Sequence, residues 1–371
     1  MNKVLLGDVA EEVRENYKAT DGNPAVVGLE HLIPGEIRLK EWSEDTNTTF
    51  TKAFHKGQVL FGRRRAYLKK AAVAPVDGIC SGDITVISAK QDKILSELLP
   101  FVIQNDDFFD FAVGKSAGSL SPRVKWSRLK EYEFNLPSLP QQKKLAKLLW
   151  SFVDTKEAYE DLIRQTDELV KSQFIEMFGD PRTNPMKWPV KNFNEIATSK
   201  IGLTYKPEDI KDGGILVLRS GNIQDSKISL NDNVYVNVEV KEDLLVKKND
   251  ILMCSRNGSA ALVGKVALIP EFDSNVTFGA FMTVIRSRYY DYLFEYFQQP
   301  AFREQISAGT STINQITQKM LSSINIPIPS EALQKQFKVF REQSDKSKFE
   351  LNEAIKDLDA MYKRVIKDNL G

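Results

Sequence analysis

Two long stretches of this sequence share one helical pattern, which limits the possible folds more than any other feature. Residues 141–178 contain no glycine and no proline, and most of their side chains favour helix. Side chains suited to packing recur there in alternating steps of four and three, the spacing of a coiled-coil seam. The seam positions are Leu148, Phe152, Thr155, Tyr159, Leu162, Thr166 and Leu169. A helix over this stretch would be roughly 57 Å long.

The same pattern returns in residues 332–371. Its positions are Phe340, Ser344, Ser347, Leu351, Ala354, Leu358, Met361 and Val365. An apolar seam on an isolated helix is not stable in water, because packing of that face supplies most of the stability of a helix. We therefore predict that the two helices pair, and that they are antiparallel because the chain between them must return. The residues predicted to pair them are Leu148, Phe152, Tyr159, Leu162, Leu169, Phe340, Leu351, Leu358 and Met361. The alternative is two amphipathic helices that each lie on their own globule.

Short motifs ahead of each helix also occur twice in the same order, which indicates a tandem duplication. A turn followed by a strand is predicted at residues 56–61 and again at 248–253, and a helix is expected near 93–112 and near 290–307. The other matches are Ile84–Ile87 with Met282–Ile285, and Leu136-Pro137 before Gln142 with Ile328-Pro329 before Gln334.

The predicted fold class is mixed α/β, with two tandem globules separated by two long helices that form an antiparallel coiled coil with approximate two-fold symmetry. Pro181, Pro185 and Pro189 follow the first helix and prevent its continuation, so this segment is expected to be a linker. The predicted boundaries are 1–140 for the first globule, 141–178 for the first helix, 179–189 for the linker, 190–331 for the second globule and 332–371 for the second helix.

Composition narrows the class of protein. A chain of 371 residues favours two or three domains, and 42% hydrophobic with 27% charged residues is typical of a soluble globular protein. The sequence shows no secretory signal and no apolar stretch of roughly 20 residues, so we expect no membrane association. Cys80 and Cys254 are the only cysteines, which suits a reducing interior, and we expect the protein to be cytoplasmic. Because the formal net charge is only +1, nucleic-acid binding must depend on local clusters.

Motifs for catalysis are missing from the sequence. His31 and His55 are the only histidines, and neither has a second histidine or a cysteine at the spacing of a metal site. Phosphate-binding loops of the G-x-x-x-x-G-K-[ST] type and the G-x-G-x-x-G dinucleotide motif are also absent. Residues 184–187, Asn-Pro-Met-Lys, lack the second proline and the aromatic residue of the N-P-P-[FY] motif of amino-methyltransferases. We therefore expect no catalytic residue, no metal and no cofactor in this chain.

Basic and polar residues cluster in two pairs of loops, and these are the predicted DNA contacts. In the first half they are Arg63, Arg64, Arg65, Tyr67, Lys69, Lys70, Lys115, Ser119, Ser121, Arg123 and Lys125. In the second half they are Arg219, Arg256, Asn257, Ser259, Lys265, Ser311, Thr312, Asn314, Gln315 and Lys319. Arginine can contact phosphate or read guanine, and asparagine can pair with adenine. The alternative is that the arginine triplet is a solvated, solubilising edge.

These features together resemble the DNA-specificity subunit of type I restriction-modification systems. The resemblance covers essentially the whole chain, and the duplicated Pro-x₄-Gln corner before each long helix carries much of it. Other similar pieces are Leu60–Lys70, Gly118–Trp126 and Met177–Pro181. It implies two target-recognition domains that read a bipartite double-stranded DNA target, two half-sites separated by unread bases.

The resemblance also implies partners. Two modification (methyltransferase) subunits would bind mainly through the helices, and restriction subunits would join that core. S-adenosylmethionine, ATP and Mg²⁺ would be bound by those partners and not by this chain, and the length of the helices would set the length of the unread spacer. The rival hypothesis from another class is a tandem-repeat coiled-coil scaffold that binds proteins rather than DNA. A self-contained methyltransferase or nuclease is disfavoured by the missing motifs.

Overall fold

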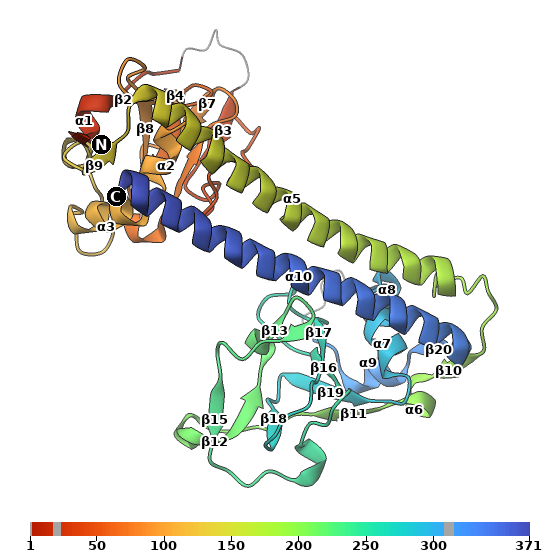
Figure 1. Cartoon of the computed structure of the whole chain (residues 1–371). Helices are drawn as coiled ribbons and strands as arrows, with labels where there is room; N and C mark the ends of the chain where they lie inside the picture. Colours follow the sequence, from red (N-terminus) through yellow and green to blue (C-terminus); the bar gives the residue numbers. More distant parts are fainter. Residues whose placement is uncertain (1, 18–23, 308–314) are drawn as a thin grey trace. The chain divides into compact units, whose positions relative to one another are not determined.

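The structure, a computed structural model, describes residues 2–17, 24–307 and 315–371. The chain forms two compact units, each containing a globule of strands and short helices and a segment of each of two long helices (Figure 1). Unit 1 comprises Met1–Leu162 and Glu350–Gly371, and unit 2 comprises Ile163–Phe349. The long helices are α5, Leu139–Phe178, and α10, Glu331–Leu370.

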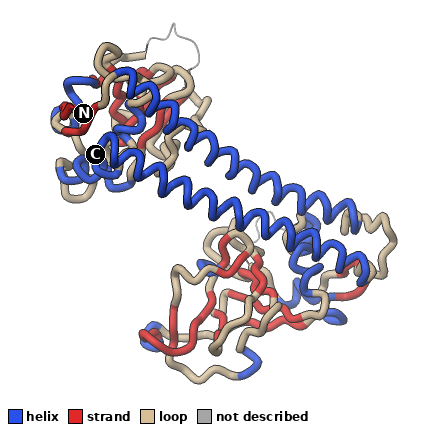
Figure 2. Tube along the Cα trace, in the orientation of Figure 1, coloured by secondary structure: helices blue, strands red, loops and turns tan. Residues whose placement is uncertain are grey.

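The globule of unit 1 contains a four-stranded sheet in the order β2-β8-β5-β6, a three-stranded sheet β3-β7-β4 and the pair β1-β9. Figure 2 shows strands in red and helices in blue. Its strands are β1 (Asn2–Leu5), β2 (Ala10–Val13), β3 (Ala25–Val27), β4 (Lys52–Phe54), β5 (Val59–Gly62), β6 (Ala71–Val73), β7 (Gly78–Cys80), β8 (Ile84–Ala89) and β9 (Glu133–Leu136). Its helices are α1 (Leu6–Val9), α2 (Leu99–Ile103), α3 (Asp106–Gly114), α4 (Trp126–Leu129) and the 3₁₀ turn η2 (Ala66–Leu68).

The globule of unit 2 contains sheets in the orders β11-β19-β16-β17 and β15-β12-β18, with the pairs β10-β20 and β13-β14. Its strands are β10 (Val190–Asn192), β11 (Thr198–Ile201), β12 (Ile210–Leu218), β13 (Ile223–Gln224), β14 (Lys227–Ile228), β15 (Val234–Val236), β16 (Ile251–Cys254), β17 (Val266–Leu268), β18 (Val276–Phe278), β19 (Met282–Arg286) and β20 (Asn325–Pro327). Its helices are α6 (Phe193–Ile196), α7 (Tyr290–Tyr296), α8 (Pro300–Ser307) and α9 (Gln318–Ser322), with 3₁₀ turns η3 (Pro207–Asp209), η4 (Ser220–Asn222) and η5 (Glu242–Leu244).

The two globules repeat one topology, as the duplicated motifs indicate. The four-stranded sheets match strand for strand, and the parallel pair β3-β7 of unit 1 matches the parallel pair β12-β18 of unit 2. The third strand of the smaller sheet differs: β4 pairs with β7 in unit 1, whereas β15 pairs with β12 in unit 2. Each region predicted as one helix, near 93–112 and near 290–307, contains two shorter helices.

The central strands of both four-stranded sheets are buried on both faces. In unit 1, Val59 and Phe61 of β5 pack into the cluster that includes the long helices, while Leu60 between them packs into a second cluster on the other face. In unit 2, Met253 of β16 packs into the cluster that includes the long helices, and Leu252 packs into a second cluster on the other face. Successive side chains of a strand point to opposite faces, so a continuous apolar run fills two cores at once.

The Pro-x₄-Gln corners fix the start of each long helix. The side-chain amide of Gln142 donates to the carbonyl of Pro137 at 3.0 Å and to Lys93 O at 3.1 Å, and its Oε1 accepts from Leu95 N at 2.9 Å. Because the Gln142 side chain is buried, these bonds satisfy polar groups that would otherwise be costly to bury. In unit 2 the amide of Gln334 donates to Pro329 O at 2.8 Å.

The long helices pack on each other within both units, which supports the predicted pairing. In unit 1, Lys156 of α5 pairs with Asp359 of α10 at 2.9 Å, and Leu149 shares a buried cluster with Ile366 and Leu370. In unit 2, Lys348 pairs with Asp167 at 2.7 Å, and the rings of Phe174 and Phe337 lie 5.7 Å apart. Higher numbers on α5 meet lower numbers on α10 in each unit, so the segments are antiparallel.

Part of the predicted seam is shifted by one residue along each helix. Side chains predicted to pair the helices are largely exposed at Leu148 (44%), Leu162 (47%), Leu169 (52%) and Met361 (55%). The next residues along, Leu149 and Val170 on α5 and Tyr362 on α10, are buried or packed against the core. Other predicted pairing residues, namely Phe152, Tyr159, Phe340, Leu351 and Leu358, are partly buried. The prediction was wrong there because Lys156 and Lys348 join the two helices through ion pairs with Asp359 and Asp167, which an apolar pattern does not reveal.

A glycine ends the first long helix. Gly179 has φ 78°, in the left-handed region that favours glycine, and its N–H donates to Ile175 O at 2.8 Å. A Cβ added there would lie 2.7 Å from the ring of Pro185.

None of the helices in the described part of the chain combines the length and the apolar character needed to span a membrane.

Candidate nucleic-acid interface

Two loops cross beside the four-stranded sheet of unit 1, and they carry the predicted arginines. The first follows β5 and contains Arg63 and Arg64, and the second precedes α4 and contains Arg123. Arg64 and Arg123 form an isolated antiparallel bridge, and Val124 N donates to Arg63 O at 3.0 Å. The backbone thus holds two arginines from segments distant in sequence side by side.

A carboxylate that the sequence did not single out clamps these arginines. Arg123 donates to both oxygens of Asp83, Nε at 2.7 Å and a terminal nitrogen at 3.2 Å, and Arg64 lies 3.6 Å from the same group. Arg64 Nε also donates to Ser121 Oγ at 2.6 Å. The hydrogen bond from Arg123 lowers the pKa of Asp83, so this carboxylate stays ionised and orients both guanidinium groups.

The other predicted residues of these loops vary in exposure. Five have exposed side chains: Arg65, Tyr67, Lys115, Ser119 and Lys125. Lys115 lies 3.7 Å from Glu131 and over the ring of Phe111. Arg63 is partly buried, and its Nε has no hydrogen-bond partner in the described structure.

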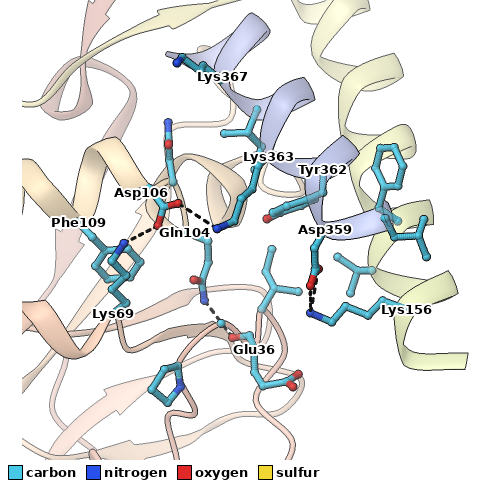
Figure 3. A pocket seen from close by; sticks show the side chains of 18 of the residues that line it. Glu36, Lys69, Gln104, Asp106, Phe109, Lys156, Asp359, Tyr362, Lys363 and Lys367 are labelled. Atoms are coloured by element: carbon cyan, nitrogen blue, oxygen red, sulfur yellow. Dashed lines mark hydrogen bonds and ion pairs between the residues drawn. The ribbon is translucent and has the colours of Figure 1, made fainter. Parts of the chain in front are cut away.

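Lys69 and Lys70 do not join the arginines. Lys70 donates to Leu29 O at 2.6 Å. Lys69 pairs with Asp106 at 2.5 Å, and Lys363 of α10 lies 3.5 Å from the same carboxylate. Figure 3 shows this network at the edge of a cavity of about 670 Å³ between the globule of unit 1 and its helix segments. The ion pairs connect the globule to α10, so they give Lys69 a structural role.

Two loops cross in the same manner in unit 2. Arg256 follows β16 as Arg64 follows β5, and it forms an isolated antiparallel bridge with Gln315. Ile316 N donates to Ser255 O at 2.7 Å, which matches the bond from Val124 to Arg63 in unit 1. The loop scaffold is therefore the same, while the side chains on it differ.

The remaining predicted residues of unit 2 lie around this crossing. Asn257 Nδ2 donates to Ser220 Oγ at 3.1 Å, which ties the loop to the turn after Arg219. Asn257 Oδ1 accepts from Ser259 N at 2.9 Å. Arg219 pairs with Asp232 at 2.9 Å. Lys265, before β17, and Lys319, on α9, have exposed side chains. Ser311, Thr312 and Asn314 lie outside the described residues.

Sequence reasoning missed three residues at the crossings: Asp83, Leu120 and Phe281. Leu120 is 91% exposed in the loop that carries Arg123, and Phe281 is 59% exposed immediately before β19. The Arg256 guanidinium lies 5.4 Å from the centre of the Phe281 ring. The position of Phe281 just before a buried strand is only a weak sequence signal for a binding residue, because apolar residues at such positions usually belong to the hydrophobic core.

The histidines and cysteines have structural surroundings. His31 Nδ1 accepts from Gly28 N at 2.9 Å, and His55 lies 3.0 Å from Glu15, which raises the pKa of His55. Burial raises the pKa of Cys80 to about 12 and also raises that of Cys254, so neither is a ready thiolate. No group of three or more histidine, cysteine or acidic residues arranged for a metal ion occurs in the described ranges.

The sequence matches the family described as "Type I restriction modification DNA specificity domain" over residues 3–165 and again over 185–358. The chain belongs to this family. Among curated proteins it is 31% identical over 161 residues to the type I restriction enzyme StySPI specificity subunit of Salmonella potsdam, a match covering 41% of this chain and 35% of that protein. It is likewise 31% identical over 161 residues to the EcoKI specificity subunit of Escherichia coli K12, covering 41% and 34%. The matched region thus spans about a third of the length of these relatives.

Solved structures share the fold over the whole chain. One, from work on "complex assembly and conformational transition of the type I R-M system", covers 99% of this chain and 97% of its own, with a TM-score of 0.61 at 19% identity. A type I restriction-modification S subunit from M. genitalium covers 100% and 96%, with a TM-score of 0.55 at 14% identity. At these identities the likeness concerns the fold alone.

Proposed function

We propose that this chain is a non-catalytic DNA-recognition subunit of a type I restriction-modification complex. It reads a bipartite double-stranded target, two short half-sites separated by unread bases. The observation that carries this proposal is the crossing of two loops beside an equivalent sheet in each unit, with one backbone scaffold and different side chains. A target with two different half-sites requires two recognition surfaces with different side chains, and the crossing loops of the two units provide them on the same backbone scaffold.

The side chains at the crossings favour base and phosphate contacts. In unit 1 the readers are Arg64 and Arg123, whose planar guanidinium groups fit guanine edges or phosphates. In unit 2 they are Arg256, Asn257 and Gln315. The exposed amide of Gln315 suits adenine, with a donor and an acceptor side by side, and Asn257 would exchange its bonds to Ser220 and Ser259 for such a pair. The exposed lysines and serines nearby position the backbone of the duplex.

Partners follow from the same proposal. The relatives are named as specificity subunits of restriction enzymes, so we assign to this chain two modification subunits, with restriction subunits joining through that complex. S-adenosylmethionine, ATP and Mg²⁺ belong to those partners, and the complex acts in the cytoplasm. The long helices are the main docking surface.

Mapping of methylated adenines in DNA from cells that carry the complete system tests the proposal. The expected result is one motif of two short sequences with a constant spacer, lost when this chain is deleted. An uninterrupted motif, or methylation that persists without the chain, would contradict it.

Binding of random duplex DNA at low ionic strength by the chain with its modification subunit gives a second test. Phosphate contacts make such binding strongly salt-dependent. Absence of any salt-sensitive binding would favour the protein-binding scaffold instead.

A further inference from the structure

Asp83 and Phe281 occupy the same position in the two units. In unit 1, Arg63 N donates to Asp83 O at 3.0 Å, and in unit 2, Ser255 N donates to Phe281 O at 2.9 Å. Asp83 directly precedes β8, and Phe281 directly precedes β19. Both strands pair with the strand that leads into the arginine loop, β5 and β16 respectively.

The two residues give this position opposite chemistry. Asp83 holds Arg64 and Arg123 by charge, so the guanidinium groups of unit 1 are oriented and partly neutralised. In unit 2 a ring replaces the carboxylate, and Arg256 lies over that ring. The Arg256 side chain is exposed, and within the described part of unit 2 it forms no ion pair with a carboxylate.

The turn around Phe281 is fixed, and yet its ring faces solvent. Its carbonyl accepts two backbone bonds, from Ser255 N at 2.9 Å and from Arg256 N at 3.0 Å. The next residue, Met282, packs inward and is 1% exposed, and Phe278, three residues before Phe281, is fully buried. An exposed aromatic side chain on a hydrogen-bonded turn, beside the exposed Arg256, is therefore presented to whatever this face binds.

We infer that Phe281 reads a thymine in the half-site recognised by unit 2, by van der Waals contact with the 5-methyl group. This inference rests on the proposed function. Of the groups that base pairs present in the major groove, the thymine methyl is the apolar one, and phenylalanine is a side chain that contacts it. Arg256 beside the ring contacts a phosphate or a guanine edge and keeps the ring against the groove. Unit 1, with Asp83 at this position, has no such methyl contact there.

The test uses the complex of the full chain with its modification subunits, on the target found by methylation mapping. Exchange of residues 1–140 with those of a relative identifies the half-site that unit 2 reads, since that half stays constant. Each thymine of this half-site is then replaced in turn by deoxyuridine, which removes the 5-methyl group and keeps base pairing. Removal of one contacted methyl should weaken binding about three- to fivefold at one position. Phe281→Ala should bind the thymine and deoxyuridine duplexes equally, and Phe281→Leu should restore part of the difference.

Matched variants separate this effect from general losses. Phe349, on α10, is 60% exposed, and Phe349→Ala should leave the thymine-to-deoxyuridine ratio unchanged. Arg256→Ala should weaken binding to both duplexes and reduce the thymine-to-deoxyuridine ratio, because the arginine keeps the ring against the groove. A half-site without thymine on either strand, or a ratio that persists in Phe281→Ala, would overturn the inference. The inference would also be overturned if Phe281→Ala weakened binding to the thymine and deoxyuridine duplexes by the same factor, because the ring would then act by stacking and not by contact with the methyl group. Failure of the unaltered complex to distinguish its target from scrambled DNA would instead refute the proposed function.

Discussion

At the scale of single residues, the crossing loops show that a basic side chain near a reading face need not belong to it. Arg64 and Lys69 come from one short segment, but Arg64 is held at the crossing by Asp83 and Ser121, whereas Lys69 binds Asp106 beside α10. The backbone is left-handed at Arg65, directly after Arg64, and again at Lys69 itself, with φ of 54° and 50°. This turn sends the two charges in different directions.

The first prediction compares these two cations. Arg64→Ala should weaken binding of the target by about 1–3 kcal/mol and relax specificity in one half-site, because a guanidinium contact to a base is lost. Lys69→Ala should leave specificity intact, because its partner is Asp106. Equilibrium binding to targets altered in either half-site measures both effects. Equal losses at both half-sites for Arg64→Ala, or a larger loss for Lys69→Ala, would count against this assignment.

The second prediction concerns Glu295 on α7, which is 4% exposed and lies 3.7 Å from Arg341 of α10. Burial raises the pKa of Glu295 to about 7, in spite of the nearby arginine. An acid with a raised pKa in the folded state contributes stability below its unfolded pKa and loses it as the pH rises through the folded value. The free energy of unfolding of the native chain relative to Glu295→Gln should therefore fall between pH 5 and pH 7, by an amount on the order of 2 kcal/mol, and the melting temperature should fall with it.

Calorimetric melting of both forms between pH 4.5 and pH 8 checks this prediction, and the difference should level off above about pH 7. Asp291→Asn is the comparison, because Asp291 pairs with Arg341 at 2.7 Å from a more exposed position. A difference between Glu295→Gln and the native chain that stays constant with pH would show that Glu295 is ionised throughout.

At the scale of elements, α5 and α10 keep a strict alternation of four- and three-residue steps, but polar and charged side chains occupy part of the seam. Lys156 and Lys348 are partly buried and pair with Asp359 and Asp167 of the opposite helix segment. An apolar pattern therefore indicates Leu148 and Met361, which are largely exposed. A long side chain with an acidic partner packs in the seam as well as leucine does.

The third prediction uses two adjacent leucines of α5 that differ only in direction. Leu149 is fully buried in the core of unit 1, and Leu148 is 44% exposed. Leu149→Glu should destabilise unit 1 by about 3 kcal/mol or more, because it buries an unpaired charge in place of an apolar side chain. Leu148→Glu should change stability by about 0.5 kcal/mol at most. Thermal unfolding of both variants provides the comparison, and equal destabilisation would restore the seam predicted from the sequence.

At the scale of the whole molecule, each unit has its own pair of hydrophobic clusters and its own crossing loops. The parallel strand pair and the four-stranded sheet are common to both, and the third strand of the smaller sheet is added on opposite sides. Independent cores with a common plan allow one reading face to change without loss of the other. The proposed dependence of spacer length on helix length stays a prediction.

The fourth prediction follows from this independence. Replacement of residues 1–140 by the corresponding segment of a relative should change one half of the methylated target and leave the other half as it was. The junction lies between Pro137 and Gln142, which the corner joins, so the relative's segment must supply a proline at the position of Pro137. Methylation mapping of the hybrid system gives the result directly. A change in both halves would show that the two readers are coupled.

The sequence by itself determined the duplication, the mixed α/β class and the two long helices, because each depends on patterns that the chain repeats in order. It also identified the arginine loops, since charge is visible residue by residue. Only the tertiary structure decided which side chains meet: Asp83 with Arg123, Phe281 with Arg256, and Lys69 with Asp106. These contacts depend on segments from distant parts of the chain that the fold brings together, and the spacing of residues along the sequence does not indicate which segments meet.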